Sequence, residues 1–245
     1  MIVEFIGSTG AGKTTLISEV QHRLAETSAV TTSFDALATP LGLSHIAHPT
    51  ARNLFQEIIG FPFFLGSLNR HKEFVAFALK MLARQATFSL FTVNNLRSLE
   101  RKIGVYEVIS RKRPDQTILV DEGTLLLAHN IFVYSNVDYT HDEIARFASL
   151  VPLPDIIIYI KAPIDILVQR SLRRSDPPRE LKSRDQGVIE RNVRRAVDMF
   201  DKLIQAEHIQ SRLLIVQNSG SNGREYDTAA DNIVKFILNY ELANK

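Results

Sequence analysis

The fold is decided by the stretch Gly7-Ser8-Thr9-Gly10-Ala11-Gly12-Lys13-Thr14. Before it, Ile2–Ile6 is an apolar run typical of a buried strand. After it, apolar residues recur at helical spacing from Leu16 to Leu24. The spacing G-x-x-x-x-G-K-S/T between a strand and a helix is that of a phosphate-binding loop. The sequence therefore predicts such a loop at the start of an α/β fold.

The residue types in this loop indicate its ligand. Glycines let the backbone curl so that successive N–H groups point at phosphate oxygens, and the helix N-terminus adds a favourable dipole. We expect Lys13 to reach the terminal phosphates and the Thr14 hydroxyl to bind Mg²⁺. A dinucleotide site is excluded because the spacing G-x-G-x-x-G is missing. The loop and the adjoining Thr15 are therefore expected to bind a nucleoside triphosphate, which the leading hypothesis takes to be ATP. The alternative is a glycine-rich turn that only caps the helix.

Further apolar runs extend the strand pattern along the whole chain, and helical patterns separate them. The predicted strands after the first are residues 29–34, 117–120, 155–160 and 212–216. This alternation predicts a three-layer α/β/α P-loop NTPase fold with a mostly parallel five-stranded sheet, formed by residues 1–245 as a single domain. Residues from about 51 to about 115 predict a helical layer, with an interruption at 60–66.

Composition excludes several classes of protein. The formal net charge of +2 is too balanced to argue for a nucleic-acid or membrane partner, and no apolar stretch has the roughly 20 residues of a bilayer span. There is no cysteine, and the first strand begins at the N-terminus without a secretion signal, so we expect a cytoplasmic protein. Residues 170–195 hold nine basic and four acidic side chains, an excess that suits an anionic ligand.

Two carboxylates follow the predicted strand at 117–120, where ligands of open α/β sheets collect. An Asp at that position in P-loop proteins holds magnesium, so Asp121 is the predicted metal residue together with Thr14. Glu122 is a catalytic candidate, because a carboxylate can accept the proton of a hydroxyl acceptor, whereas a phosphate acceptor needs no base. The alternative is that both side chains only cap the next turn.

Several features now occur in one order: the loop, a helical stretch ending in Asn95-Leu96-Arg97, the strand with Asp121, and Leu167-Val168-Gln169-Arg170-Ser171-Leu172-Arg173-Arg174. In this order the chain resembles the P-loop nucleoside and nucleoside-monophosphate kinases, most closely the thymidylate kinase-like group. The resemblance implies that residues from about 51 to about 115 form the acceptor side and that about 170–185 form a lid.

The same resemblance implies roles for single residues. Arg170 would pack against adenine, and Arg173, Arg174 and Arg179 would be lid arginines that stabilise charge on the transferred phosphoryl group. Arg97 would face the acceptor's phosphate, and the segment from Asn218 to Gly223 would lie where relatives wrap a loop around adenine. For each arginine the alternative is a solvated surface position.

The chain also departs from this group. Thymidylate kinases usually have Asp-Arg where this chain has Asp121-Glu122, and their Glu-Pro-Gly-Gly signature is replaced by residues that begin at Asp35. Asp35 can contact the acceptor or cap a turn. The acceptor therefore stays open among nucleotides, nucleosides, sugars and other metabolites.

The leading hypothesis is an ATP- and Mg²⁺-dependent kinase that phosphorylates a small-molecule acceptor, with a nucleotide or nucleoside favoured. A second hypothesis is an NTP-hydrolysing switch or accessory ATPase that acts on a protein partner. A third is a catalytically silent nucleotide-binding scaffold. The phenylalanine-rich stretch 61–64 leaves a homodimer open.

Overall fold

The computed structural model describes residues 1–84, 90–112, 116–134, 138–175, 177, 181–182, 185–219 and 223–244. Five strands form one sheet in the order β2-β3-β1-β4-β5, and every neighbouring pair is parallel. The strands are β1 Ile2–Ile6, β2 Val30–Thr32, β3 Thr117–Val120, β4 Ile156–Lys161 and β5 Leu213–Gln217. The predicted parallel five-stranded sheet is therefore confirmed. In β1 and β3 every residue is buried, which explains their continuous apolar sequences.

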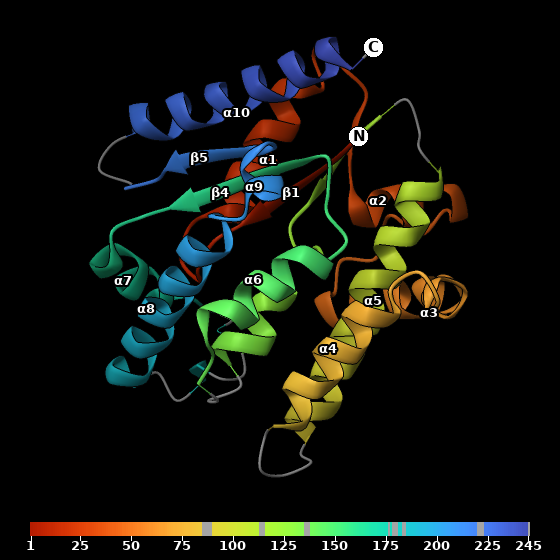
Figure 1. Ribbon diagram of the computed structural model, residues 1–245. Helices are drawn as coiled ribbons and strands as arrows, with labels where there is room; N and C mark the ends of the chain where they lie inside the picture. Colours follow the sequence, from red (N-terminus) through yellow and green to blue (C-terminus); the bar gives the residue numbers. More distant parts are fainter. Residues whose placement is uncertain are drawn as a thin grey trace.

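Helices cover both faces of the sheet, as Figure 1 shows. On one face lie α1 Lys13–Leu24 and α10 Gly223–Ala243, whose apolar residues share a core with Val3 and Phe5 of β1. On the other face lie the π-helix η2 His129–Val133, α6 His141–Leu150 and the carboxyl half of α8 Gln186–Leu203, around Ile157 and Tyr159 of β4. The three-layer α/β/α fold is confirmed.

Three long helices form the layer predicted between the second and third strands. They are α3 Pro49–Ser67, α4 Lys72–Ala83 and α5 Leu90–Lys112. The expected interruption at 60–66 is wrong, since α3 runs through it. Gly60 instead lies against Gly104 of α5, where a Cβ on Gly104 would come 2.4 Å from the carbonyl oxygen of Gly60. Gly60 therefore allows α3 and α5 to pack closely where they cross, and it does not end α3.

The second strand is shorter than predicted, since it ends at Thr32. The Thr32 side chain accepts a hydrogen bond from the backbone N–H of Asp35 at 3.2 Å and caps α2, Ser33–Ala38. Thr is a favoured cap, and the capping bond starts a helix where apolar alternation alone predicts strand. Asp35 therefore lies in the first turn of a helix and not at a strand end.

Short helices complete the described chain: η1 Thr39–Leu41, α7 Ile164–Arg173 and α9 Glu207–Gln210. Through the described ranges, each helix falls short of the length and apolar content that a bilayer crossing requires.

Candidate active site

A pocket of about 710 Å³ opens beside the carboxyl ends of β1 and β3, where the two strands lie side by side. The phosphate loop and the start of α1 form one wall, and α5 forms another. The end of α7 adds arginines, and the segment around η2 adds polar side chains. The described lining residues are Gly7, Thr9, Gly10, Ala11, Gly12, Lys13, Thr14, Thr15, Asn53, Ser98, Arg101, Lys102, Asp121, Glu122, Leu126, His129, Asn130, Tyr134, Arg170, Arg173, Arg174 and Pro177.

The loop can adopt its shape only with glycine at two positions. Gly10 and Gly12 have φ values of 83° and 87°, in the left-handed region that side chains disfavour. A Cβ on Gly10 would lie 2.6 Å from the carbonyl oxygen of Leu167, and one on Gly12 would lie 2.4 Å from Nδ2 of Asn218. Any side chain at either position would therefore deform the loop or displace its supports.

Lys13 lies over the phosphate loop. Its Nζ donates hydrogen bonds to the carbonyl oxygens of Gly7 at 2.9 Å and Ser8 at 3.4 Å. Burial lowers the pKa of Lys13, while the charges of Asp121 and Glu122 oppose the shift. Phosphate oxygens would supply further negative charge to this ammonium group. The arrangement fits the predicted role of Lys13. Ser8, in contrast, is buried and lies outside the pocket lining.

The predicted metal residues are in contact. Thr14 Oγ1 donates a hydrogen bond to Asp121 Oδ2 at 3.0 Å, although the two residues are far apart in the sequence. A hydroxyl and a carboxylate oxygen side by side fit Mg²⁺, which usually keeps several waters and binds one or two protein oxygens besides phosphates. In the described residues no group of three or more His, Asp or Glu side chains is placed to hold a metal. A bound nucleotide would supply further oxygens to such an ion.

Arg170 and Asn218 support the loop from behind. Arg170 Nη1 donates to the carbonyl oxygens of Gly10 and Asn218, each at 3.3 Å. Asn218 Nδ2 donates to the carbonyl oxygen of Ala11 at 2.7 Å, and Asn218 is buried. Contacts of these two residues with bound nucleotide remain predictions.

The predicted lid is described in part. Arg173 and Arg174 both line the pocket at the end of α7, and Pro177 lies beside them. The predicted lid arginine Arg179 lies outside the described residues.

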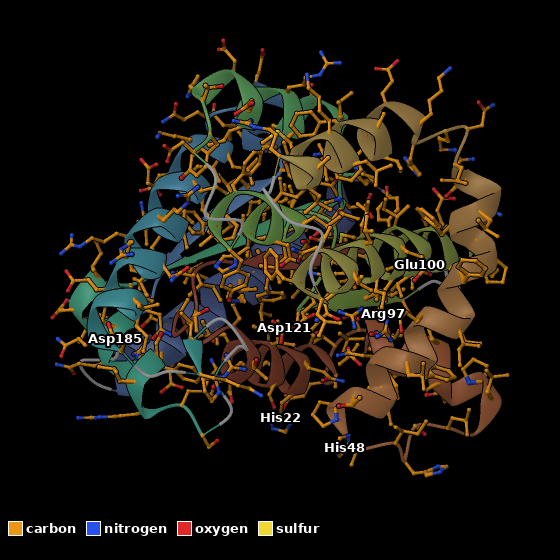
Figure 2. All side chains as sticks on the ribbon, turned by 90° about the horizontal axis from the view of Figure 1, so that it is seen from below. His22, His48, Arg97, Glu100, Asp121 and Asp185 are labelled. Atoms are coloured by element: carbon orange, nitrogen blue, oxygen red, sulfur yellow. The ribbon has the colours of Figure 1, made fainter. Side chains whose placement is uncertain are left out.

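Two predicted acceptor residues lie outside the pocket lining. Arg97 donates from Nε and Nη2 to the carboxylate of Glu57 on α3, at 2.7 and 2.6 Å. Figure 2 shows Arg97 and Glu100 near α3 and Asp121 apart from them. Arg97 precedes Ser98 and so lies roughly 100° round α5 from that pocket residue. The carboxylate of Asp35 accepts a 2.7 Å hydrogen bond from Thr32.

Sequence reasoning missed one wall of the pocket. Ser98, Arg101 and Lys102 lie on one face of α5, at the spacing i, i+3, i+4. Asn53, His129, Asn130 and Tyr134 also line the pocket. The spacing on α5 was a signal, but in a polar helical stretch it is equally typical of a solvated face.

Glu122 faces the pocket and forms an ion pair. Arg101 Nη2 lies 3.3 Å from Glu122 Oε2, and the Glu122 side chain is 60% exposed. The charge of Lys102, followed by that of Arg101, keeps the pKa of Glu122 below its usual value. Glu122 is therefore ionised at neutral pH.

Glu4 lies buried beneath this site in β1. It accepts hydrogen bonds from the N–H of Leu126 at 3.1 Å and from Thr124 Oγ1 at 3.4 Å. Burial raises the pKa of Glu4 to about 7, and the charge of Lys102 opposes the shift. A Cβ on Gly123 would lie 2.3 Å from the Glu4 carboxyl group. Glu4 therefore holds the segment that follows Asp121 and Glu122.

The raised pKa of Glu4 predicts a pH-dependent stability. Between pH 4.5 and about 7 the unfolded chain loses this proton before the folded chain does, so stability falls as pH rises. Glu4→Gln removes this titration and keeps the shape. We expect the free energy of unfolding of Glu4→Gln minus that of the wild type to rise by at most roughly 3 kcal/mol as the pH increases from 4.5 to about 7. Urea unfolding from pH 4 to 8 measures it.

Glu73→Gln is the matched control, because Glu73 is exposed on α4. The pH dependence of the difference between Glu4→Gln and wild type is compared with that of this control. If the two do not differ, Glu4 does not titrate as proposed.

Of the comparisons with known proteins, only the one with solved structures gives matches. No protein-family model matches the chain, and no curated protein matches it. A solved structure of deoxyadenosine kinase from M. mycoides, with products dCMP and a flexible dCDP bound, has a TM-score of 0.48 and 14% identity, over 98% of this chain and 100% of that chain. The same enzyme with bound dATP has a TM-score of 0.45 and 13% identity, over 97% and 98%. Shikimate kinase from Acinetobacter baumannii, in complex with shikimate, has a TM-score of 0.43 and 16% identity, over 100% and 94%.

Proposed function

We propose that this chain is an ATP- and Mg²⁺-dependent phosphotransferase that moves the γ-phosphoryl group to a small-molecule acceptor, with a nucleotide or nucleoside favoured. One observation carries the proposal. Lys13, the Thr14–Asp121 pair, and Arg173 and Arg174 face a single pocket that continues past the loop to polar side chains of α5. A site that only binds ATP does not need the part of the pocket that lies next to α5, whereas a kinase needs this space for an acceptor.

The site supplies position and charge for an in-line transfer. An oxygen of the acceptor forms a bond to the γ-phosphorus while the bridging P–O bond breaks, and its electron pair stays on ADP. We expect Lys13 to stabilise charge on the transferred group together with Arg173 and Arg174, which line the same pocket. The loop N–H groups and the start of α1 hold the remaining phosphate oxygens.

Thr14 and Asp121 would hold the magnesium ion, which neutralises charge between the phosphates when bound. Their 3.0 Å hydrogen bond brings both oxygens to one point at the rim of the loop. Thr14 and Asp121 would thereby help to fix the terminal phosphates relative to Lys13. Glu122, the second carboxylate, would not be needed for this task.

Glu122 has one of two tasks, depending on the acceptor. A hydroxyl acceptor releases a proton, and the ionised Glu122 is a carboxylate in the pocket that can take it. A phosphate acceptor is already anionic, in which case Glu122 orients Arg101 through their ion pair. Arg97 and Asp35 would reach an acceptor only by leaving their partners Glu57 and Thr32.

Acceptor-dependent consumption of ATP tests the proposal. The protein is incubated with Mg²⁺-ATP and a panel of nucleotides, nucleosides and sugars. We expect ADP to form with one class of acceptor, and mass spectrometry to show one added phosphate on it. If no acceptor gains a phosphate while a protein partner accelerates hydrolysis, the site belongs to an NTP-driven switch and the kinase proposal is wrong.

A further inference from the structure

Lys102 is a buried cation in the acceptor half of the pocket. It is 4% exposed, yet it lines the pocket from α5, across from the phosphate loop. In the part of the chain that the structure describes, its ammonium group makes no hydrogen bond and no ion pair within 4.0 Å. Lysine is seldom buried to this extent without a partner. Its ammonium nitrogen is not fully enclosed, so a ligand group in the pocket can reach it.

The carboxylates around Lys102 are already engaged elsewhere. Glu122 pairs with Arg101, Asp121 accepts a hydrogen bond from Thr14, and Glu4 accepts from Thr124 and Leu126. All three attract Lys102 electrostatically, but none bonds to it. Burial nevertheless lowers the pKa of Lys102 to about 8, so these charges do not fully compensate. The three N–H donors of its ammonium group remain available to a ligand.

The charge of the pocket indicates what kind of ligand fits. The described lining residues include six Lys or Arg side chains and two carboxylates, an excess of four positive charges. Magnesium-bound ATP carries a net charge of about −2 and so neutralises about half of this excess. An acceptor with a phosphate group would neutralise most of the remainder. A neutral nucleoside or sugar would leave it uncompensated.

The face of α5 is shaped for such a group. Ser98, Arg101 and Lys102 stand at i, i+3 and i+4, so one hydroxyl and two cations are directed at the same side of the pocket. Glu122 lies there as well, but one carboxylate against two cations leaves the position net positive. Arg97 lies off this face and is held by Glu57.

We propose that Lys102, with Arg101 beside it, forms an anion subsite that binds the phosphate group of a phosphomonoester acceptor. This inference rests on the proposed function and narrows it, because it names the acceptor as a phosphorylated molecule, such as a nucleotide or sugar phosphate. It assigns the acceptor's phosphate to Lys102 and not to Arg97. Lys102 is thereby a residue that determines specificity.

Phosphate binding to the nucleotide-loaded protein tests this subsite. The protein is saturated with Mg²⁺ and the imido analogue of ATP, whose γ-phosphate fills the donor position and cannot be transferred. Inorganic phosphate is then titrated in by calorimetry, and acetate is titrated in a parallel series. We expect one phosphate to bind to the wild type. Lys102→Met should weaken this binding on the order of tenfold or more, since a charge-assisted bond is lost. Acetate should bind more weakly than phosphate.

Two further variants fix the interpretation. Lys80→Met, an exposed lysine of α4, should leave phosphate affinity unchanged. Arg97→Met should also change phosphate affinity by no more than about twofold, because Arg97 lies outside the pocket lining and pairs with Glu57 at the surface. Loss of phosphate binding in Arg97→Met but not in Lys102→Met would overturn the assignment.

The remaining outcomes are equally decisive. Replacing a buried charge by an apolar group of similar shape is often tolerated, and Lys102→Gln serves if Lys102→Met does not fold. The idea is wrong if the loaded wild type binds no phosphate, or binds acetate as tightly. Because the measurement needs no turnover, it separates failure of this subsite from failure of the kinase proposal, which the acceptor panel decides.

Discussion

Replacing Lys13 with methionine is expected to lower phosphoryl transfer by roughly 10³-fold, since a fixed cation at the transferred group is lost. Lys13 Nζ now bonds to the carbonyl oxygens of Gly7 and Ser8 and would turn to the phosphates when ATP binds. Methionine keeps the length of the side chain without the charge. The measurements are ATP affinity by calorimetry and initial rates with the best acceptor.

The same variant should be more stable than the wild type. Burial lowers the pKa of Lys13, which means that the folded state disfavours its charge. Removing an ammonium group that the fold disfavours should raise the melting temperature in the absence of nucleotide. Lys235→Met, on the exposed side of α10, is the control and should change neither property. A Lys13→Met protein that keeps the wild-type transfer rate would show that the loop does not serve catalysis as proposed.

The sheet was largely predictable because its signals are local. Each strand is a short apolar run, and the glycine loop between Ile6 and Lys13 fixes one strand–helix connection. The errors arose where a second interaction competed with the periodic pattern. Thr32 ended β2 early by capping α2. Gly60 looked like a helix break, but its partner Gly104 lies on another helix and is not visible from local sequence.

The residues of the site were likewise predictable where the signal is local and not predictable where it depends on packing. Thr14 and Asp121 were paired from sequence, because both follow strands whose carboxyl ends lie at the same edge of the sheet. Lys102 lines the pocket but was not predicted from sequence, whereas Arg97 was predicted as an acceptor residue and lies outside the lining, although the two are close in sequence. Which of them faces the pocket depends on the rotation of α5 about its axis. That rotation is set by packing against α3, and no motif encodes it.

Asp121→Asn is expected to weaken Mg²⁺ binding to the nucleotide complex on the order of 100-fold, the larger end of what metal-orienting groups contribute. The amide oxygen of asparagine can still accept the hydrogen bond from Thr14 Oγ1, now 3.0 Å long, so the local structure should persist. The negative charge is lost, and with it an attraction that opposes the lowering of the pKa of Lys13 by burial. Magnesium titration of the ADP complex, with the transfer rate measured in parallel, gives both effects.

The partner variant Thr14→Val separates a shared metal site from two independent roles. If both oxygens hold one ion, the loss of Mg²⁺ affinity in the double variant should be smaller than the two single losses combined, because the first change already removes the site. Asp165→Asn, an exposed carboxylate in the first turn of α7, should leave Mg²⁺ affinity unchanged. Additive losses would mean that Thr14 and Asp121 contribute to Mg²⁺ binding independently, with Asp121 acting in part through the charge it places beside Lys13.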